Sequence, residues 1–223
     1  LTVTNLVQNG DFRNGTSGWS AGGNTLSADN GVLRNTATGT TEFPYVSRKL
    51  FTKRRGQKLY VRVKAKVTNS ECQYIRLMVG SISVYQYTPE ANKEYLISGV
   101  LTMPIDDTNI WYVVYHGYEN AEVATGKVME IREAMTVDLT AMFGAGNEPT
   151  KEECDKMFSR YIDGTKSTIS AFRIRSVSED ESQESVVYVL AKDDEGNIEE
   201  LRSLPNGVKD EFRVSEGKLI QRI

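Results

Sequence analysis

The chain is poor in the residues that build disulfide frameworks and imidazole metal sites. Its 223 residues include two cysteines, Cys72 and Cys154, and one histidine, His116. Two cysteines so far apart form neither a disulfide framework nor a zinc site, so we expect both thiols to be unpaired. A single histidine excludes metal sites that need several imidazoles, and we expect no cofactor beyond the calcium question raised below.

The chain also lacks a basic excess and long apolar runs. Lysine and arginine number 27 against 30 aspartates and glutamates, which gives a formal net charge of −3. Because nothing is in excess to neutralise phosphates, we expect no nucleic-acid partner. No stretch approaches the roughly 18 apolar residues of a membrane-spanning helix, so we expect no membrane partner. With 39% hydrophobic and 26% charged residues, the composition is that of a folded globular chain.

Short strands dominate the first 137 residues. The clearest runs from Lys58 to Val67, where every second residue from Leu59 is apolar and the residues between them are polar or tyrosine. Such alternation predicts a strand with one buried face. Further strands are predicted at 73–79, 82–87, 94–102, 110–116 and 127–137, and shorter ones near Leu6, at 31–36 and at 46–51. Many short strands without long helices between them indicate an antiparallel sandwich or barrel.

The pattern changes over residues 141–166, which we expect to form a loop and a helix. The loop is rich in glycine, and the sequence TKEE at 150–153 then matches a capping box, in which Thr150 and Glu153 cap the first turn. Apolar residues follow at helical spacing and Gly164 is placed to end the helix, so we predict one short helix over about 151–162, docked on the sandwich edge.

Residues 167–223 return to strand patterns and are predicted to form a small β-hairpin unit. Strands are expected at 171–177, 185–192, 198–203, 208–214 and 218–223, with the charged stretch 178–184 between the first two. The turn sequences DDEGN (193–197) and SEG (215–217) predict two hairpins. Because isolated hairpins are marginally stable in water, we expect this unit to pack on the sandwich or on other chains.

The opening sequence NLVQNGDFRNGTSGWS, residues 5–20, resembles the start of jelly-roll carbohydrate-binding modules. The resemblance implies a jelly-roll β-sandwich over residues 1–140, with Leu6 in the first strand and Phe12 and Trp19 plugging the sandwich edge. In several such modules a carboxylate near this edge holds structural calcium. Arg13 stands where the family usually has glutamate, which leaves Asp11 as the candidate metal ligand.

A second resemblance concerns VDLTAMFGAGNEPT at 137–150, GKVME at 126–130 and ELRSLPNGVKDE at 200–211. These stretches are similar to segments of minor structural tail proteins of phages and prophages of Gram-positive hosts, and they occur in the same order. The resemblance implies a protein of the virion tail, assembled in the bacterial cytoplasm, with other phage tail proteins as partners. By analogy with phage fibres it also implies a homotrimer.

Sequence motifs for catalysis are lacking. The chain has no G-x-S-x-G nucleophile elbow, no H-E-x-x-H and no phosphate-binding G-x-x-x-x-G-K-[ST]. His116 ends a strand and shares a face with apolar residues, which indicates a structural role. The acidic pairs at 106–107 and 152–153 fit turn and cap chemistry better than the paired carboxylates of a glycosidase. We therefore expect a protein that is not an enzyme.

Carbohydrate binding is the leading hypothesis, because 11 tyrosines are more than core packing needs. Aromatic rings stack on the C–H faces of sugars, and polar side chains bind the hydroxyls. The candidates lie on the strand faces opposite the apolar stripes or, for Tyr45, in a loop where packing and ligand contact are both open. They are Tyr45, Tyr60, Arg62, Tyr74, Arg76, Tyr85, Tyr87, Trp111 and Tyr115.

If the strands of Tyr60 and Tyr74 are neighbours, their tyrosines, arginines and lysines form one mixed aromatic and cationic surface. Such a surface suits a cell-wall polysaccharide or a teichoic-acid-like glycan, and the function expected is receptor recognition on the host surface. Two alternatives to this hypothesis stay open. In the first, the surface is an ordinary solvated strand face whose charges discourage edge pairing. In the second, the whole module is a structural spacer or assembly unit of the tail.

Overall fold

The computed structural model of the protein describes residues 2–50, 55–104 and 110–162, together with the backbone of six strands beyond them. The strands of the first part are β1 (Thr2–Val3), β2 (Ser20–Gly22), β3 (Asn24–Asp29), β4 (Val32–Ala37), β5 (Tyr45–Lys49), β6 (Lys58–Val67), β7 (Tyr74–Val79), β8 (Ile82–Tyr87), β9 (Tyr95–Thr102), β10 (Trp111–Gly117) and β11 (Val128–Asp138). The helices are α1 (Ala121–Ala124), α2 (Leu139–Phe143) and α3 (Lys151–Met157). The later strands are β12 (Ser167–Thr168), β13 (Ala171–Phe172), β14 (Val187–Lys192), β15 (Ile198–Arg202), β16 (Phe212–Ser215) and β17 (Lys218–Gln221).

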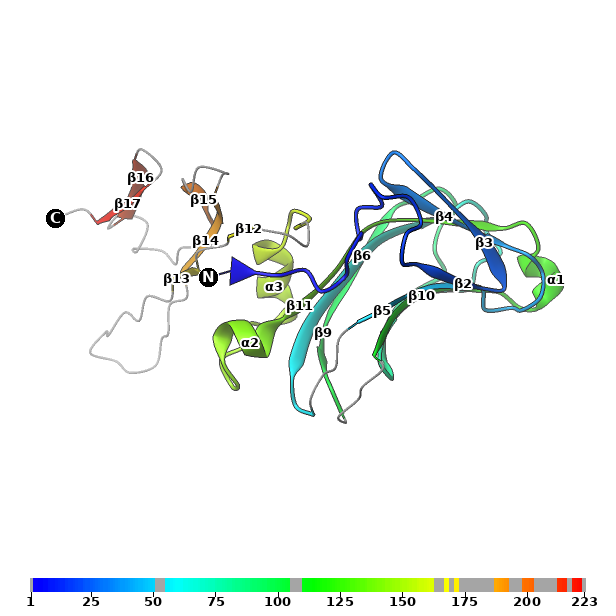
Figure 1. Ribbon diagram of the computed structural model, residues 1–223, viewed down its shortest axis with the longest axis horizontal. Helices are drawn as coiled ribbons and strands as arrows, with labels where there is room; N and C mark the ends of the chain where they lie inside the picture. Colours follow the sequence, from blue (N-terminus) through cyan, green and yellow to red (C-terminus); the bar gives the residue numbers. More distant parts are fainter. Residues whose placement is uncertain are drawn as a thin grey trace.

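Two antiparallel five-stranded sheets form the main body. Sheet I has the order β2-β5-β10-β7-β8, and sheet II has the order β3-β4-β11-β6-β9. Figure 1 shows the sheets packed face to face and curved in the same sense, with β5 and β10 of sheet I on the inner side of the curve. The predicted antiparallel jelly-roll β-sandwich is confirmed.

The core lies between the two sheets and follows the alternation of the strands. Sheet II contributes the stripe from Leu59 to Val67, and sheet I contributes Ile75, Leu77 and Val79 together with Tyr112 and Val114. All of these side chains are almost completely buried. Each strand therefore turns its other face away from the core, and the outer face of sheet I is the one that bears on function.

Most predicted strands are observed within a few residues of their expected ends, and β6 and β8 match completely. β2 and β3 were not predicted. β3 is a sheet-edge strand with one large apolar residue, Leu26, and its burial alternates between half-buried and exposed, so its apolar signal is weak.

The strand expected near Leu6 is wrong. The segment around Leu6 is held by the side chain of Asn5 and not by strand pairing. The Asn5 Nδ2 donates to the carbonyls of Ala134 and Ile162 at 3.1 and 3.2 Å. Its Oδ1 accepts from the amides of Val7 and Thr136, both at 3.0 Å. The predicted burial of Phe12 and Trp19 is confirmed, with their ring centroids 5.2 Å apart.

Helix α3 begins as predicted and ends early. Thr150 and Glu153 form the capping box, but the helix ends at Met157 instead of Ile162. The Phe158 carbonyl accepts a hydrogen bond from the buried guanidinium of Arg62, and the chain turns away there.

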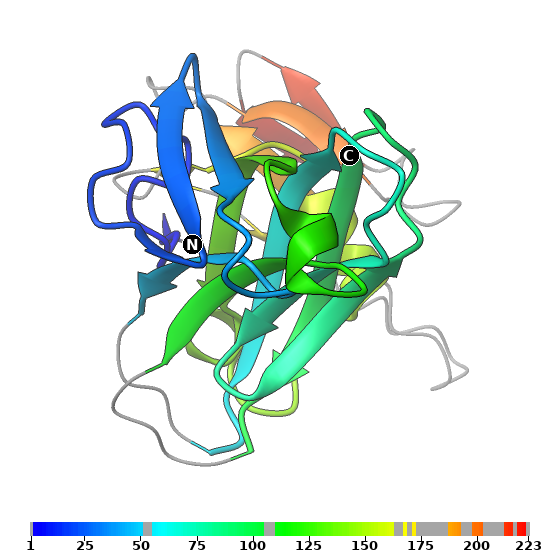
Figure 2. The same ribbon diagram turned by 90° about the vertical axis from the view of Figure 1, so that its right-hand side faces the viewer.

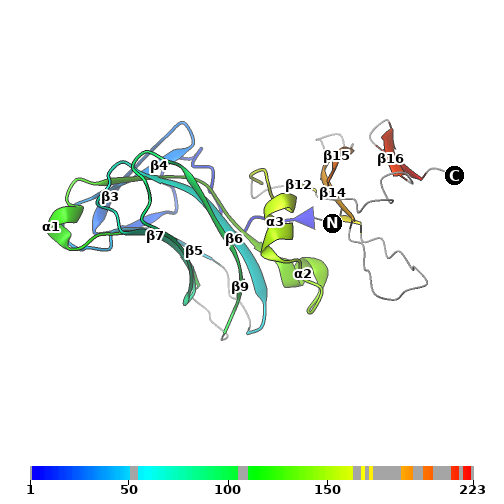
Figure 3. The ribbon, with the colours of Figure 1, turned by 180° about the vertical axis from the view of Figure 1, so that it is seen from behind.

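As predicted, α3 docks at the sandwich edge, where it contacts the edge strand β9 of sheet II, but its apolar side chains also reach over the outer face of that sheet. α2 contacts β6 and α3 contacts β9, and both helices lie on the outer side of sheet II, as Figures 1 and 3 show from opposite sides. There they close a second apolar cluster, which contains Val3, Tyr60, Met135, Val137, Leu139, Cys154, Met157, Phe158 and Ile162. The outer face of sheet II is therefore covered at this end.

The short helix α1, which was not predicted, lies at the other end of the sandwich and faces the viewer in Figure 2. Asn120 caps its first turn by accepting from the amide of Val123. In the parts of the chain that are described, no helix is long and apolar enough to cross a membrane.

Of the C-terminal residues, only the strands are described. β13, β14 and β15 form an antiparallel sheet, β16 pairs with β17, and β12 pairs with β1. The two predicted strand pairs around 193–197 and 215–217 are confirmed, although most residues of these turns, and the charged stretch 178–184, lie outside the described residues. The boundaries proposed for the three units, 1–140, 141–166 and 167–223, stay a prediction.

Candidate functional site

The outer face of sheet I is lined by aromatic side chains. Along β10, Tyr112, Val114 and His116 point into the core, so Trp111, Val113 and Tyr115 point outward. The neighbouring strands obey the same alternation. The outward residues are Tyr45, Ser47 and Lys49 on β5, Tyr74, Arg76 and Met78 on β7, and Ser83, Tyr85 and Tyr87 on β8.

Strand register places four of these side chains in one row across the sheet. Tyr45 pairs with Tyr115, Tyr115 with Arg76, and Arg76 with Tyr85. The Tyr45 and Tyr115 rings are 5.2 Å apart between centroids, and the Arg76 guanidinium carbon lies 5.2 Å from the Tyr115 centroid and 5.6 Å from that of Tyr85. At roughly 4.8 Å between strands, the row is roughly 14 Å long, which exceeds the length of a single sugar ring.

A second group of rings extends the row at the β8 edge of sheet I. Tyr74 pairs with Tyr87, and the Tyr85 and Tyr87 rings are stacked 5.2 Å apart with 5° between their planes. Phe43, an exposed residue just before β5, stacks on Tyr74 at 6.4 Å. Burial raises the pKa of Tyr74 and of Tyr115, so both keep their phenolic protons at neutral pH.

Two glycines let the rings lie flat against the sheet. A Cβ atom added to Gly22 would come within 2.2 Å of the Tyr45 ring, and one added to Gly117 within 2.3 Å of the Tyr74 ring. Each glycine stands opposite its tyrosine on the adjacent strand. The sequence did not reveal these glycines or Phe43 as part of the site, because their role depends on which strands are neighbours.

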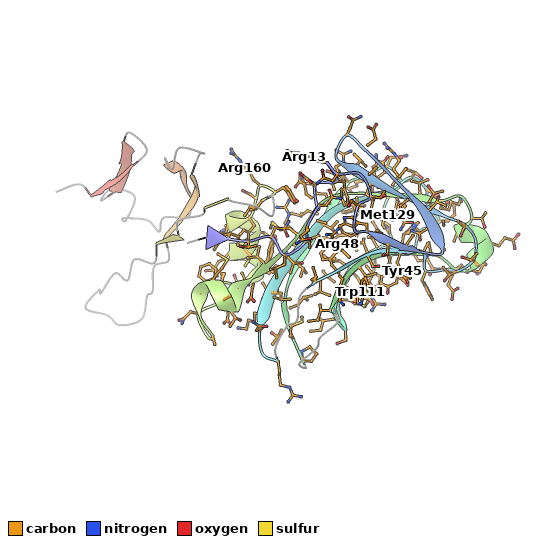
Figure 4. All side chains as sticks on the ribbon, in the orientation of Figure 1. Arg13, Tyr45, Arg48, Trp111, Met129 and Arg160 are labelled. Carbon is orange, nitrogen blue, oxygen red and sulfur yellow. The ribbon has the colours of Figure 1, made fainter. Side chains whose placement is uncertain are left out.

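At the end of the face that carries Trp111, the surface deepens into a cleft of about 500 Å³. Trp111, Tyr115 and Tyr45 line it, with Ser20 and Ser47 supplying hydroxyl groups. Figure 4 shows Tyr45 and Trp111 on sheet I, and Met129 on β11 of the opposite sheet. An open, mainly apolar cleft with three aromatic rings and a few hydroxyl groups is a common kind of small-molecule or sugar site.

Seven of the nine predicted site residues therefore share the outer face of sheet I. They are Tyr45, Tyr74, Arg76, Tyr85, Tyr87, Trp111 and Tyr115. Tyr45, which was expected in a loop, is the first residue of β5; it packs on Tyr115 and lines the cleft, and its contact with a ligand stays a prediction.

The predicted exposure of Tyr60 and Arg62 is wrong. Both are fully covered on sheet II, so they form no common surface with Tyr74 and Arg76 of sheet I. Tyr60 stacks on Phe158 and donates to Asp155 at 2.8 Å; burial first, then this hydrogen bond, raise its pKa far above the ordinary value. Arg62 forms an ion pair with Glu133 at 2.5 Å. The physical reason is the second apolar cluster, which covers the face that the alternation of β6 left polar.

The calcium suggested at Asp11 is not supported by the side chains around it. The Asp11 carboxylate accepts from the Arg13 backbone amide at 3.3 Å and pairs with its guanidinium at 3.1 Å. Within the described residues, no three histidine, cysteine or acidic side chains come together as a metal site would need. Arg13, which stands where the family usually has glutamate, thus pairs with the Asp11 carboxylate. Asp11 and Arg13 together do not fit a calcium ion.

His116 and the two cysteines are placed as structural residues. The His116 ring is buried in the core with its Nδ1 2.9 Å from the Tyr118 hydroxyl, and burial lowers its pKa to about 3. It is therefore neutral at pH 7 and turned away from the aromatic face. Cys72 and Cys154 are unpaired, as predicted, and both are buried. Burial raises the pKa of both thiols, that of Cys72 to about 12, which makes them poor nucleophiles.

Comparison with known proteins gives likenesses of fold only. No family model and no curated protein matches the sequence. Among solved structures, the chain is similar to the arabinose-bound α-L-arabinofuranosidase MgGH51, with a TM-score of 0.51 and 9% identity over 61% of this chain and 26% of that one. It also matches a structure described as a CBM4 (TM-score 0.46, 14% identity, 56% of this chain and 97% of that one). Another match is the enzymatically active domain of tailspike protein 4 of bacteriophage CBA120 (0.45, 13%, 60% and 21%).

Proposed function

We propose that this protein is a non-catalytic module that binds carbohydrate on the outer face of sheet I. The observation that carries the proposal is the continuous row of Tyr45, Tyr115, Arg76 and Tyr85, which continues into the Trp111 cleft. Packing alone hardly explains a row of rings on one face, because Tyr85, Tyr87 and Trp111 are exposed to solvent, where polar side chains would be more favourably hydrated.

The chemistry of the face suits a sugar chain. Tyrosine and tryptophan rings pack against the C–H faces of pyranoses at little conformational cost, since each side chain has few rotatable bonds. Hydroxyl groups of Ser20, Ser47 and Ser83 lie among the rings, where they can exchange hydrogen bonds with sugar hydroxyls. The length of the row favours a glycan chain over a monosaccharide.

A binding role without catalysis is supported by the chemistry of the described residues. His116 is neutral and turned into the core, and both thiols are buried. On the strands of sheet I, the side chains of the outer face include no carboxylate that could serve as one of a catalytic pair.

For its biological setting, we propose a phage tail or baseplate that adheres to the cell wall of a Gram-positive host. The support is the sequence at 137–150, with the two shorter stretches that accompany it in tail proteins. An open face of this kind binds weakly per copy, and several copies on one virion would multiply the effect. Other tail proteins would then be the assembly partners.

The proposal is tested by titrating the protein, alone and clustered on a multivalent carrier, with cell-wall polysaccharides purified from a panel of Gram-positive bacteria. Binding to at least one polysaccharide is expected. Tyr85→Ala and Trp111→Ala should each weaken it by about tenfold or more, since aromatic anchors at an interface commonly contribute at least about 1–2 kcal/mol.

The matched control is Leu96→Ala, which shortens an exposed apolar side chain on β9 of the opposite sheet. Its affinity should equal that of the unmodified protein. If the clustered protein binds none of the wall polysaccharides, the carbohydrate role is refuted and the module is better explained as a structural spacer or assembly unit of the tail.

A further inference from the structure

Charged side chains are treated differently on the two sheets. On sheet II the cations are paired: Arg34 and Lys66 both contact Glu130, and Arg62 and Lys64 both contact Glu133. On sheet I, Arg76 in the centre of the aromatic face forms no ion pair with any described residue. A half-buried guanidinium without a carboxylate loses part of its hydration and gains no opposite charge in return.

The Arg76 side chain is nevertheless fixed in position. Its Nε donates to the Ser83 hydroxyl at 2.8 Å and its Nη2 lies 3.0 Å from the Met78 sulfur. The Tyr115 and Tyr85 rings flank the guanidinium on its two sides along the row. Nη1 has no partner within the described residues, and Nη2 has a second hydrogen to donate, so two adjacent donors stay available for an oxyanion.

We propose that Arg76 makes the aromatic face selective for an anionic glycan, one that carries a carboxylate or phosphate on the sugar. This inference rests on the proposed carbohydrate-binding function and specifies its ligand class. Sugar rings stack on Tyr45 and Tyr115 or on Tyr85. The oxyanion substituent of one ring then accepts hydrogen bonds from Nη1 and Nη2 of Arg76, which lies between Tyr115 and Tyr85. The guanidinium thus exchanges its incomplete hydration for a charge-assisted pair of hydrogen bonds.

The other charged side chain on the outer face of the described strands of sheet I is also positive. Lys49, also exposed and on the outer side of β5, stands opposite Trp111 and adds a second positive charge near the cleft. The outward side chains of the described strands of sheet I contain no aspartate or glutamate. Glu42, in the segment before β5, lies close enough to Tyr74, at the edge of the face, to raise the pKa of that phenol.

The test uses the wall polysaccharide that binds best, in three forms: untreated, with its carboxyl groups reduced to alcohols, and with its phosphodiesters removed by hydrofluoric acid. Each form is titrated against the unmodified protein and against Arg76→Gln, Arg76→Lys and Arg34→Gln. Arg34→Gln is the matched control, because it removes an arginine from sheet II. Urea unfolding of each variant verifies that it is folded.

Removing the relevant anion should weaken binding of the unmodified protein by about tenfold, the value of one charge-assisted contact. Arg76→Gln should weaken binding of the untreated form similarly and respond little to the treatments, Arg76→Lys should fall between, and Arg34→Gln should behave as unmodified protein. Loss on carboxyl reduction assigns a carboxylate, and loss on hydrofluoric acid treatment assigns a phosphate; either supports the inference.

Equal binding of all three forms, with Arg76→Gln unchanged, would overturn the anionic selectivity and leave carbohydrate binding intact. If no wall polysaccharide is bound at all, the proposed function itself fails, and the inference fails with it. The two failures are therefore distinguishable by whether the untreated form binds.

Discussion

Replacing Glu133 by alanine should strongly destabilise the protein without altering its ligand-binding face. The Arg62 guanidinium is 1% exposed, and its contacts are the Glu133 carboxylate at 2.5 Å and the Phe158 carbonyl. Its Nε has no hydrogen-bond partner in the described part of the chain. In the Glu133→Ala variant, the buried Arg62 guanidinium would keep the neutral Phe158 carbonyl as its one hydrogen-bond acceptor among the described residues.

The magnitude follows from the burial of the two partners. Breaking a buried ion pair by removing one side costs about 3–5 kcal/mol, because the other charge is left uncompensated. The Glu133 side chain is 28% exposed, so water can enter part of the vacated space, and we expect a loss of about 2–4 kcal/mol. That is a large share of the roughly 5–15 kcal/mol that stabilises a typical domain.

Urea unfolding at pH 7 measures this loss, with Lys64→Met as the matched control. Lys64 contacts the same carboxylate at 2.7 Å but is 33% exposed, so its removal should cost less than about 1 kcal/mol. A Glu133→Ala protein as stable as Lys64→Met would show that Arg62 is hydrated after all, and would refute the structural role assigned to it. Loss of glycan binding in a folded Glu133→Ala protein would equally contradict the assignment of the site to sheet I.

Three further predictions concern the parts of the chain that hold this arrangement. Because burial lowers the pKa of His116 to about 3, the unfolded chain takes up a proton below pH about 6.5 and the folded chain does not. As the pH is lowered from about 6.5 to 3, the free energy of unfolding should therefore decrease, by about 3 kcal/mol at pH 4.5. His116→Gln should remove this part of the pH dependence, as measured by urea unfolding at pH 7 and 4.5. Thr150→Ala removes the cap of α3 and should cost about 1 kcal/mol, seen as a lower thermal midpoint; an unchanged midpoint would mean that Glu153 alone satisfies the helix start. Tyr60→Phe removes the hydrogen bond to Asp155 and should cost about 1–3 kcal/mol by urea unfolding with no change in glycan affinity, so a weakened affinity would return Tyr60 to the binding site.

The alternation of β6 predicted its inner face correctly and its outer face wrongly. Leu59 to Val67 point into the core as expected, but Tyr60 and Arg62 are covered by residues that come about 80–100 positions later in the chain. A local period of two indicates which side chains share a face; it does not indicate what packs on that face. The sequence Ala-Met-Thr-Val at 134–137 on β11, which breaks the alternation of apolar and polar residues, was a usable signal, because strands buried on both faces lose their alternation; all four residues are buried.

The aromatic face of sheet I was predictable one strand at a time, but not as a surface. Apart from Tyr45, which was expected in a loop, the tyrosines of this face are candidates because they lie opposite an apolar stripe, and that rule holds for β7, β8 and β10. The row itself depends on the strand order β5-β10-β7-β8, which is set by long-range pairing that the sequence pattern does not specify. For the same reason the space that Gly22 and Gly117 leave for rings on adjacent strands appears only in the structure.

Binding of a glycan to the outer face of sheet I can be located by mapping backbone amide chemical shifts. The ligand added is a set of short oligosaccharides cut from a wall polysaccharide that the protein binds. We predict saturable shifts concentrated on β5, β7, β8 and β10, strongest around Tyr115 and Arg76, with β6, β9 and α3 unchanged. Shifts centred on sheet II or on the C-terminal hairpins, with no shifts on sheet I, would contradict the assignment of the binding site to the aromatic face.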